Sequence, residues 1–246
     1  MVKKTAFLAF FLLSAINVTL AQDESPEELL NKGVNLLNTG QYSQAIAVFS
    51  SYLELDPDNS KVYYNRATAQ FNILQFDSAL ADVNNAIRLQ PDDADAYFLR
   101  GLIYKQEKNS REALKDFTKS LELSPEFAEA YNNRGMLYTE EKQYPNAILD
   151  FTKAIKYNPL YSEAYYNRGY TYIQTEEYGE AIKSLDNAIR LDSTFTLSYV
   201  NRGLAYYAIQ EYKKCMKDLQ HAIKMESSYK PELDKYIKSC KKNLED

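Results

Sequence analysis

A period of 34 residues runs along this 246-residue chain and restricts its fold more than any other feature. Five of the seven glycines follow steps of 34 or 68 residues: Gly33, Gly101, Gly135, Gly169 and Gly203. Four of the seven prolines follow the same step: Pro57, Pro91, Pro125 and Pro159. Because two residue types share one period, the sequence predicts tandem copies of one supersecondary unit.

In register, six repeats follow one another without a gap: 26–59, 60–93, 94–127, 128–161, 162–195 and 196–229. Within a repeat, two segments place apolar residues three and four apart, which is the spacing of an amphipathic helix. Turn residues such as Thr39-Gly40-Gln41 separate the segments, and the recurring proline is expected to end the second helix. Small residues at repeat positions 8 and 20 let the two helices approach closely. Each helical hairpin then needs a neighbouring hairpin to bury its faces.

These features resemble the tetratricopeptide repeat (TPR), a 34-residue unit with an aromatic residue at position 4, small residues at 8, 20 and 27, Tyr at 11 and Pro at 32. Position 4 is Tyr in five of the six repeats, and position 11 is Tyr in four. Departures are Leu36 and Gln70 at position 11, and Ser193 and Ser227 at position 32. The resemblance covers 26–229 and implies an all-α fold, a right-handed α-solenoid of six hairpins.

The segment 230–246 is predicted to be a capping helix, because the end of a solenoid needs a polar outer face. Its apolar stripe is Leu233, Ile237, Cys240 and Leu244. The opposite face carries Lys235, Lys238, Lys241 and Lys242. We interpret these lysines as a solvated face that complements the helix dipole, with an acidic partner as the alternative.

The N-terminus has the pattern of a secretory signal peptide, 1–21, followed by a short segment, 22–25. Lys3 and Lys4 precede an apolar run at 6–13, and Thr19-Leu20-Ala21 predicts cleavage after Ala21. A membrane anchor is the less favoured alternative, because Ser14 and Asn17 interrupt the run. Cleavage would leave 27 basic and 34 acidic residues, a net charge of −7. We therefore expect export, to the periplasm or beyond it by secretion, since Gln22 and the compact signal resemble Gram-negative export.

Several function classes have no support in the sequence. An acidic chain without a basic stripe is unsuited to nucleic acid, and no later segment is long and apolar enough to span a membrane. His221 is the single histidine, and glycine-rich phosphate loops and metal-binding motifs do not occur. We therefore expect no catalytic residues, no metal and no cofactor.

Arginine recurs at position 7 in five repeats: Arg66, Arg100, Arg134, Arg168 and Arg202. Position 23 of the same repeats is acidic in four of the five: Asp82, Asp116, Asp150, Ser184 and Asp218. The first repeat lacks both, with Lys32 and Val48 in these places. This joint occurrence predicts an Arg–Asp bridge between the two helices of each hairpin. The alternative is an arginine row that grips carboxylates of a partner.

In the family that the chain resembles, ligands lie along the concave face, formed by first-helix positions 2, 5, 9, 12 and 13. The corresponding candidate residues are Tyr64, Phe71, Phe98, Leu102, Met136, Tyr166, Tyr170, Ile173, Leu204 and Tyr207. Charged residues are interspersed among them: Lys61, Asp95, Glu129 and Glu163. The resemblance thus implies a peptide or helix groove, and packing between neighbouring first helices is the alternative. The lysine that a terminal-carboxylate clamp needs at position 5 is missing from every repeat.

Cys215 replaces the small residue at position 20 of the last repeat, and Cys240 lies in the predicted cap. They either form a bridge that pins the cap or remain two buried thiols. Together the features favour a non-catalytic scaffold or adaptor that binds another protein in the cell envelope. A holdase-like chaperone and a fixed structural subunit of a complex are the alternatives. The sequence predicts no oligomeric state.

Overall fold

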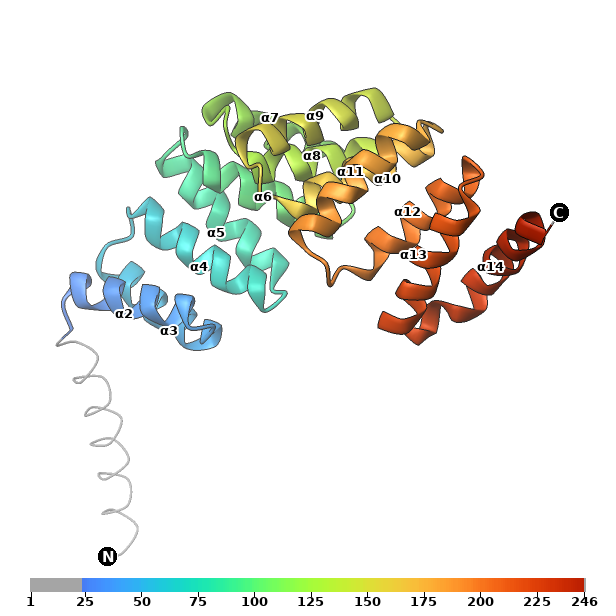
Figure 1. Cartoon of the computed structure of the whole chain (residues 1–246). Coiled ribbons are helices and arrows are strands. Elements are labelled where there is room, and N and C mark those ends of the chain that lie inside the picture. Colours follow the sequence, from blue (N-terminus) through green and yellow to red (C-terminus); the bar gives the residue numbers. More distant parts are fainter. Residues whose placement is uncertain (1–23, 246) are drawn as a thin grey trace, which may run out of the picture. The chain divides into compact units, whose positions relative to one another are not determined.

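The structure, a computed structural model, describes residues 24–245 (Figure 1). The predicted signal peptide 1–21 and the first two residues of the segment 22–25 lie outside the described residues. Ser25 caps the first described helix: Glu28 donates its N–H to Ser25 Oγ, and Ser25 donates its N–H to the Glu28 carboxylate. Over the described residues, none of the helices is both long enough and apolar enough to cross a bilayer.

Each repeat contains a first helix of 13 residues and a second helix of 14. The first helices are α2 (Pro26–Asn38), α4 (Ser60–Asn72), α6 (Ala94–Gln106), α8 (Ala128–Glu140), α10 (Ser162–Gln174) and α12 (Thr196–Ala208). The second helices are α3 (Tyr42–Leu55), α5 (Phe76–Leu89), α7 (Ser110–Leu123), α9 (Tyr144–Tyr157), α11 (Tyr178–Leu191) and α13 (Tyr212–Met225). A short 3-10 helix, η1 (Ser227–Tyr229), leads into the capping helix α14 (Lys230–Glu245).

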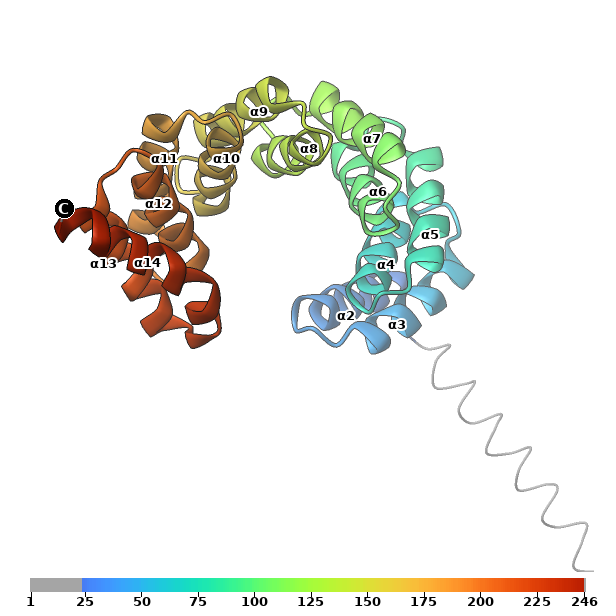
Figure 2. The same cartoon turned by 90° about the vertical axis from the view of Figure 1, so that its right-hand side faces the viewer.

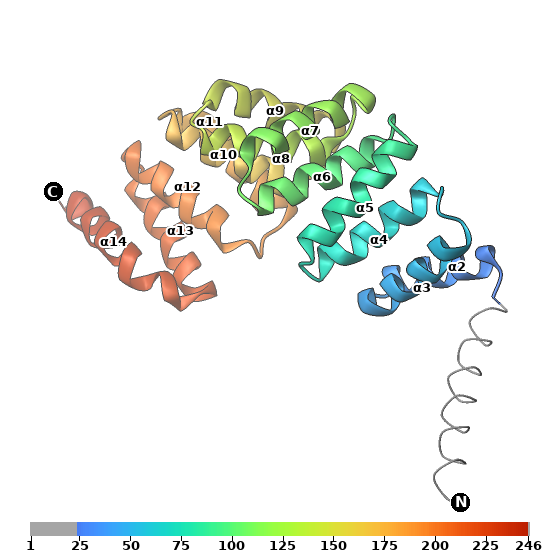
Figure 3. The same ribbon diagram turned by 180° about the vertical axis from the view of Figure 1, so that it is seen from behind.

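The described residues form two compact bodies, an N-terminal body that ends at Asp116 and a C-terminal body that begins at Phe117, within α7. In the N-terminal body, the helices from α2 to α6 pack each against the next, and in the C-terminal body those from α8 to α14 do the same. Figure 2 shows the two layers of the N-terminal body, with α4 and α6 in one layer and α5 and α7 in the other. Figures 1 and 3 both place α14 alongside α13, which it contacts. We call the layer of first helices in each body its first-helix face.

The turn inside every hairpin has the same backbone conformation at repeat position 15. This residue has a positive φ of 59–74° in all six repeats: Gly40, Leu74, Lys108, Lys142, Glu176 and Gln210. In the fourth repeat, the N–H of Gln143 donates to the carbonyl of Tyr138, and that of Lys142 to Thr139. This pair of bonds is a Schellman motif, which favours glycine at the left-handed position. Only the first repeat supplies glycine there, so the other five turns carry backbone strain.

Proline does not determine where the second helices end, contrary to the expectation from the sequence. The two repeats that lack Pro at position 32 still end their second helices at position 30, at Leu191 and Met225. After Leu191, the backbone of Asp192 turns to an extended conformation. The side chain of Asp192 then accepts hydrogen bonds from the N–H and Oγ1 of Thr194, at 2.9 and 2.7 Å. Asp56 and Asn158 make the same kind of side-chain turn in repeats that keep the proline, so this turn belongs to the linker whether or not proline is present.

Close packing inside the hairpins rests on matched sizes at positions 8 and 24. A Cβ added to Gly135 would lie 2.8 Å from Phe151 Cε1, so only glycine fits beside this phenylalanine. In the second repeat Ala67 takes the glycine position, and the smaller Val83 takes the phenylalanine position in the same core cluster. Alanine is larger than glycine and valine is smaller than phenylalanine, so the two changes compensate in volume, as a close-packed interior requires.

Candidate functional site

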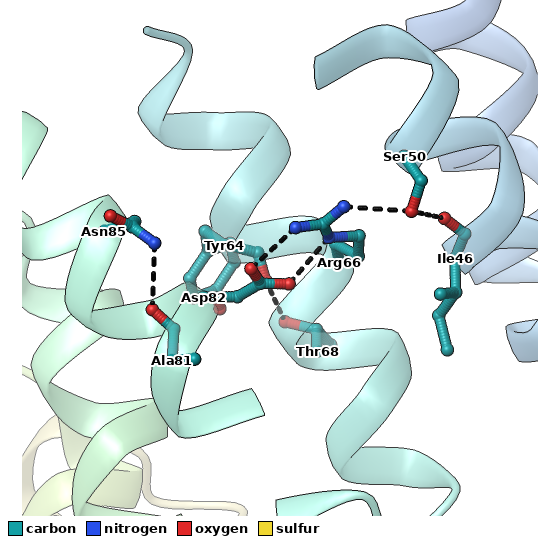
Figure 4. A network of polar contacts seen from close by, with 8 residues as sticks. All are labelled: Ile46, Ser50, Tyr64, Arg66, Thr68, Ala81, Asp82 and Asn85. Carbon is teal, nitrogen blue, oxygen red and sulfur yellow. Dashed lines mark hydrogen bonds and ion pairs between the residues drawn. The ribbon is translucent and has the colours of Figure 1, made fainter. Parts of the chain in front are cut away.

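The Arg66 guanidinium joins three helices through its side-chain hydrogen bonds (Figure 4). Its Nε and Nη2 donate to the two carboxylate oxygens of Asp82 on α5, at 2.7 and 2.8 Å. Its Nη1 donates to Ser50 Oγ on α3, the second helix of the preceding hairpin, at 2.9 Å. The bidentate pair therefore closes one hairpin, while the third bond ties that hairpin to its neighbour.

The same arrangement recurs in the third, fourth and sixth repeats. Arg100, Arg134 and Arg202 bind both carboxylate oxygens of Asp116, Asp150 and Asp218, at 2.7–2.9 Å. Their Nη1 atoms donate to a residue at position 25 of the preceding repeat: Asn84, Thr118 and Asp186. Reasoning from the sequence missed this third bond, although its acceptors also recur every 34 residues.

Burial of the ion pairs makes the arginines part of the framework. The Asp150 side chain is 3% exposed and that of Arg134 is 15% exposed. Arg134 also lies over the Tyr131 ring, at 5.7 Å from its centre. Hydrogen bonding to Asp82 is the main cause that raises the pKa of the Arg66 guanidinium. Because the repeat's own acceptors engage these guanidinium groups, the arrangement favours the bridging interpretation over a row that grips a partner.

The fifth repeat departs from this scheme. Ser184 stands where the other four have Asp, and Arg168 Nε donates to its hydroxyl at 3.2 Å. Arg168 Nη1 donates to Thr152 Oγ1 at 3.3 Å. Ser184 is 1% exposed. This guanidinium is therefore held by hydroxyl groups in place of a carboxylate.

All ten predicted partner-binding residues lie on first helices. They are Tyr64 and Phe71 on α4, Phe98 and Leu102 on α6, Met136 on α8, Tyr166, Tyr170 and Ile173 on α10, and Leu204 and Tyr207 on α12. Tyr170 is 39% exposed, and the other nine are half-buried. Much of each half-buried side chain packs within its own body. The alternative interpretation, packing between neighbouring first helices, therefore accounts for part of this surface.

In the N-terminal body, Tyr64 and Phe71 pack on the core of the second repeat. The Phe71 ring centre lies 5.8 Å from that of Phe76. Burial raises the pKa of the Tyr64 hydroxyl, and the Asp95 carboxylate raises it further. These aromatic residues therefore serve packing as well as offering a partly exposed edge.

In the C-terminal body, the structure brings Met136, Tyr166 and Tyr170 together. Met136 and Tyr170 line a cavity of about 130 Å³ whose other walls are Thr139, Glu140, Phe151 and Asn167. The Tyr166 ring stacks on Tyr170 with centres 6.5 Å apart. Asn201 donates to the Tyr166 hydroxyl at 3.1 Å, which fixes the orientation of that ring. The first-helix face thus has an opening beside an exposed, supported tyrosine.

Glu140 is the acidic residue among those that line this opening, and two more glutamates lie nearer the N-terminal ends of α8 and α10. Glu129, Glu140 and Glu163 are exposed on the first helices α8 and α10. Burial is the main cause that raises the pKa of Tyr161 to about 12, and the carboxylates of Glu163 and Glu129 add to it. Asn132, 4% exposed at the place where a carboxylate clamp would need lysine, donates to the Tyr161 hydroxyl at 3.3 Å. Negative charge therefore lies at the cavity through Glu140 and, separately, near Tyr161 through Glu129 and Glu163.

The capping helix covers two of the predicted partner-binding residues. The Tyr207 ring lies 5.2 Å from Tyr236 of α14, and its hydroxyl lies 2.9 Å from Ser239 Oγ. Leu204 and Tyr207 both pack against the core shared by α13 and α14. For Leu204 and Tyr207 these contacts favour packing against the cap over an open groove.

A larger cavity, of about 470 Å³, lies among α11, α12 and α13, and it was not foreseen from the sequence. It is lined by Ile189, Tyr199, Arg202, Lys217, Asp218, Gln220, His221 and Lys224. His221 packs on the Tyr199 ring, with centres 4.5 Å apart. The spacing of Lys217, His221 and Lys224 along one helix face was the signal that could have located it. In residues 24–245, no three His, Cys, Asp or Glu side chains are grouped as metal ligands.

Cys215 and Cys240 are both free thiols in the structure, so the bridge considered from the sequence is not formed. Their Sγ atoms lie 3.1 Å apart, a non-bonded contact, whereas a disulfide bond measures about 2.05 Å. Both residues are fully buried. Burial, with the Cys240 thiol beside it, raises the pKa of the Cys215 thiol. The structure therefore corresponds to the second alternative, in which the two cysteines are buried thiols.

Models of the tetratricopeptide repeat match most of the chain. Those described as "Tetratricopeptide repeat" match 36–103, 94–127, 128–161, 151–183 and 197–229, and one described as "TPR repeat" matches 169–210. A comparison with curated proteins finds no match.

Three similar solved structures have the same fold. YrrB, described as a TPR protein with an unusual peptide-binding site, is 21% identical with a TM-score of 0.66, over 78% of this chain and 97% of that one. PilF of Pseudomonas aeruginosa is 16% identical with a TM-score of 0.74, over 83% and 93%. The C-terminal part of a TPR repeat-containing protein from Cytophaga hutchinsonii is 18% identical with a TM-score of 0.72, over 88% and 89%. At these identities the similarity concerns the fold alone.

Proposed function

This chain belongs to the tetratricopeptide repeat family, and we propose that it is a non-catalytic scaffold that binds a peptide or helix of another protein along its first-helix face. The observation that carries the proposal is the opening in the C-terminal body beside Tyr170. Tyr170 is the most exposed of the ten candidate side chains, and its neighbour Tyr166 is held by stacking and by Asn201. A supported tyrosine next to a small apolar cavity is the usual form of an interface anchor.

The charges around the opening define the chemistry of the partner segment. Glu140 lines the cavity beside Met136 and Tyr170, and Glu129 and Glu163 add exposed negative charge elsewhere on α8 and α10. A segment with one apolar side chain for the cavity, flanked by Lys or Arg, complements this surface. Its association rate should fall as salt is added, because exposed charges are screened. The described peptide-binding site of YrrB supports binding of this kind on the fold, although the low identity transfers no residue from that site.

The test is binding of an identified partner by matched variants. Proteins captured by the chain are identified, and the binding segment of each is then measured by calorimetry. Tyr170→Ala combined with Met136→Ala removes the anchor, while Lys224→Ala changes the cavity among α11, α12 and α13. We expect the first variant to lose about tenfold or more in affinity and the second to bind normally. The opposite pattern would move the interface to the second cavity and refute the proposal.

The same capture separates the alternative functions. A scaffold selects one or two partners through a short motif, and a holdase-like chaperone binds many unrelated unfolded chains weakly. A structural subunit co-purifies with one fixed partner whether or not Tyr170 is present. Only the first outcome, combined with loss on the Tyr170→Ala change, supports the proposal.

We also propose that the chain acts outside the cytoplasm, in the periplasm of a Gram-negative cell. Lys3, Lys4, the apolar run at 6–13 and Thr19-Leu20-Ala21 support export with cleavage after Ala21. Fractionation of cells, with intact-mass analysis of the protein in each fraction, tests this. We expect a mature chain in the envelope fraction that begins at Gln22. A cytoplasmic protein that retains Lys3 and Lys4 would refute it.

A further inference from the structure

The joint between the last hairpin and the cap contains both cysteines of the chain. Position 20 is a fully buried alanine in the other five repeats: Ala45, Ala79, Ala113, Ala147 and Ala181. In the last repeat it is Cys215, on α13, and its Sγ lies 3.1 Å from Sγ of Cys240 on α14. The departure from alanine therefore occurs in the one repeat whose neighbour is the cap and at the point where that cap supplies a second sulfur.

We propose that Cys215 and Cys240 form a reversible disulfide that fastens α14 to α13. The two sulfurs are already in contact, and both helices pack into one core that includes Leu219, Leu233 and Ile237. Bond formation therefore requires the sulfurs to approach by about 1 Å, within the reach of side-chain rotation and small helix shifts. This inference does not depend on which surface binds the partner.

The bond forms by two thiol–disulfide exchanges with an oxidised dithiol protein or oxidised glutathione. The thiolate of one cysteine attacks a sulfur of the acceptor disulfide, and the acceptor's other sulfur leaves as a thiolate. The thiolate of the second cysteine then attacks the first cysteine's sulfur in the mixed disulfide and releases the remaining acceptor sulfur. In sum, the chain loses two electrons and two protons, and the acceptor disulfide becomes two thiols.

Because both thiols are buried, the capping helix must open before an oxidant can reach them. Both thiols are fully buried, and burial keeps Cys215 protonated by raising its pKa, whereas exchange needs an accessible thiolate. In the C-terminal body, α14 packs mainly on α13 and η1 and reaches α12 through Tyr207, so we expect it to open at lower cost than a helix held between two hairpins. Once oxidised, the cap can no longer leave. Tyr207, which contacts Tyr236 and Ser239 of α14, then stays covered.

The experiment compares the reduced chain with the same chain after incubation with oxidised glutathione under native conditions. Intact mass should fall by two hydrogen atoms, alkylation in denaturant should find no free thiol, and peptide mapping should link Cys215 to Cys240. Amide hydrogen exchange in α14 should slow by about tenfold or more on oxidation, and reductant should reverse this. Cys215→Ala, which restores the alanine of the other repeats, and Cys240→Ala should show neither effect.

Two results would overturn the inference. The first is that both cysteines are still alkylated after oxidation and unfolding, or that only glutathione adducts or linked dimers form. The second is that the bond forms while exchange in α14 is unchanged, since the bond would then fasten nothing.

Discussion

Replacing Asp150 with Ala tests whether the arginine row supports the fold. The change removes two charge-assisted hydrogen bonds, of 2.7 and 2.9 Å, from Arg134. At about 1.5–3 kcal/mol for each bond to a charged group, their loss amounts to about 3–6 kcal/mol. Leaving one member of a buried pair without its partner costs about 3–5 kcal/mol. Because the Arg134 side chain is still 15% exposed, we expect the lower part of that range, about 3 kcal/mol.

The matched control is Asp186→Ala, which removes an acceptor of the same charge from Arg202. The Asp186 side chain is 50% exposed and accepts one bond, at 2.7 Å. An exposed pair of this kind contributes at most about 1 kcal/mol. The assay is urea unfolding of both variants and the parent chain, followed by far-ultraviolet circular dichroism and fitted with one m value. If Asp150→Ala costs no more than Asp186→Ala, burial is not what gives these pairs their effect and the reasoning is refuted.

A double variant distinguishes the cost of losing the ion pair from the cost of leaving one buried charge without its partner. Changing Arg134 and Asp150 together to Leu removes both charges and leaves no unpaired charge, although Thr118 loses its bond from Arg134. Replacing a buried pair by apolar residues of similar volume is often close to neutral. We therefore expect this double variant to be more stable than Asp150→Ala in the same urea titration. A double variant that is less stable would show that the geometry of the bridge, and not the unpaired charge, dominates.

Three further changes follow from the repeat geometry, and each is measured by thermal and urea unfolding. Ser184→Asp should stabilise the chain by about 1–2 kcal/mol, because it gives Arg168 the carboxylate that four other repeats have; an unchanged or lower stability would contradict this. Gly135→Ala should destabilise it by about 1–3 kcal/mol, because the new Cβ would meet the Phe151 ring at 2.8 Å, and adding Phe151→Val should recover part of the loss. Leu74→Gly should stabilise it by about 1 kcal/mol, because Leu74 has a φ of 62° and is 73% exposed; a loss of stability would show that its strain is negligible.

The sequence by itself determined the repeat, its register and the partners within each hairpin. First and second helices begin and end at the same repeat positions, because the helical period and turn geometry are set over a few residues. Arg134 and Asp150 are 16 residues apart on the two helices of one hairpin, so their joint recurrence was enough to pair them. The family resemblance, and the fold that it implies, depend on the same local pattern.

Only the tertiary structure decided which surfaces are open. The third bond of Arg134, to Thr118 of the preceding repeat, depends on how one hairpin stacks on the next. Tyr170 and Tyr207 are both tyrosines on first helices, yet one is exposed beside a cavity and the other lies under the cap. The exposure of these tyrosines and the contact between the two cysteine sulfurs depend on residues distant in the sequence and on the packing of the capping helix α14. A periodic sequence does not encode these differences, because its period makes equivalent positions look alike until packing distinguishes them.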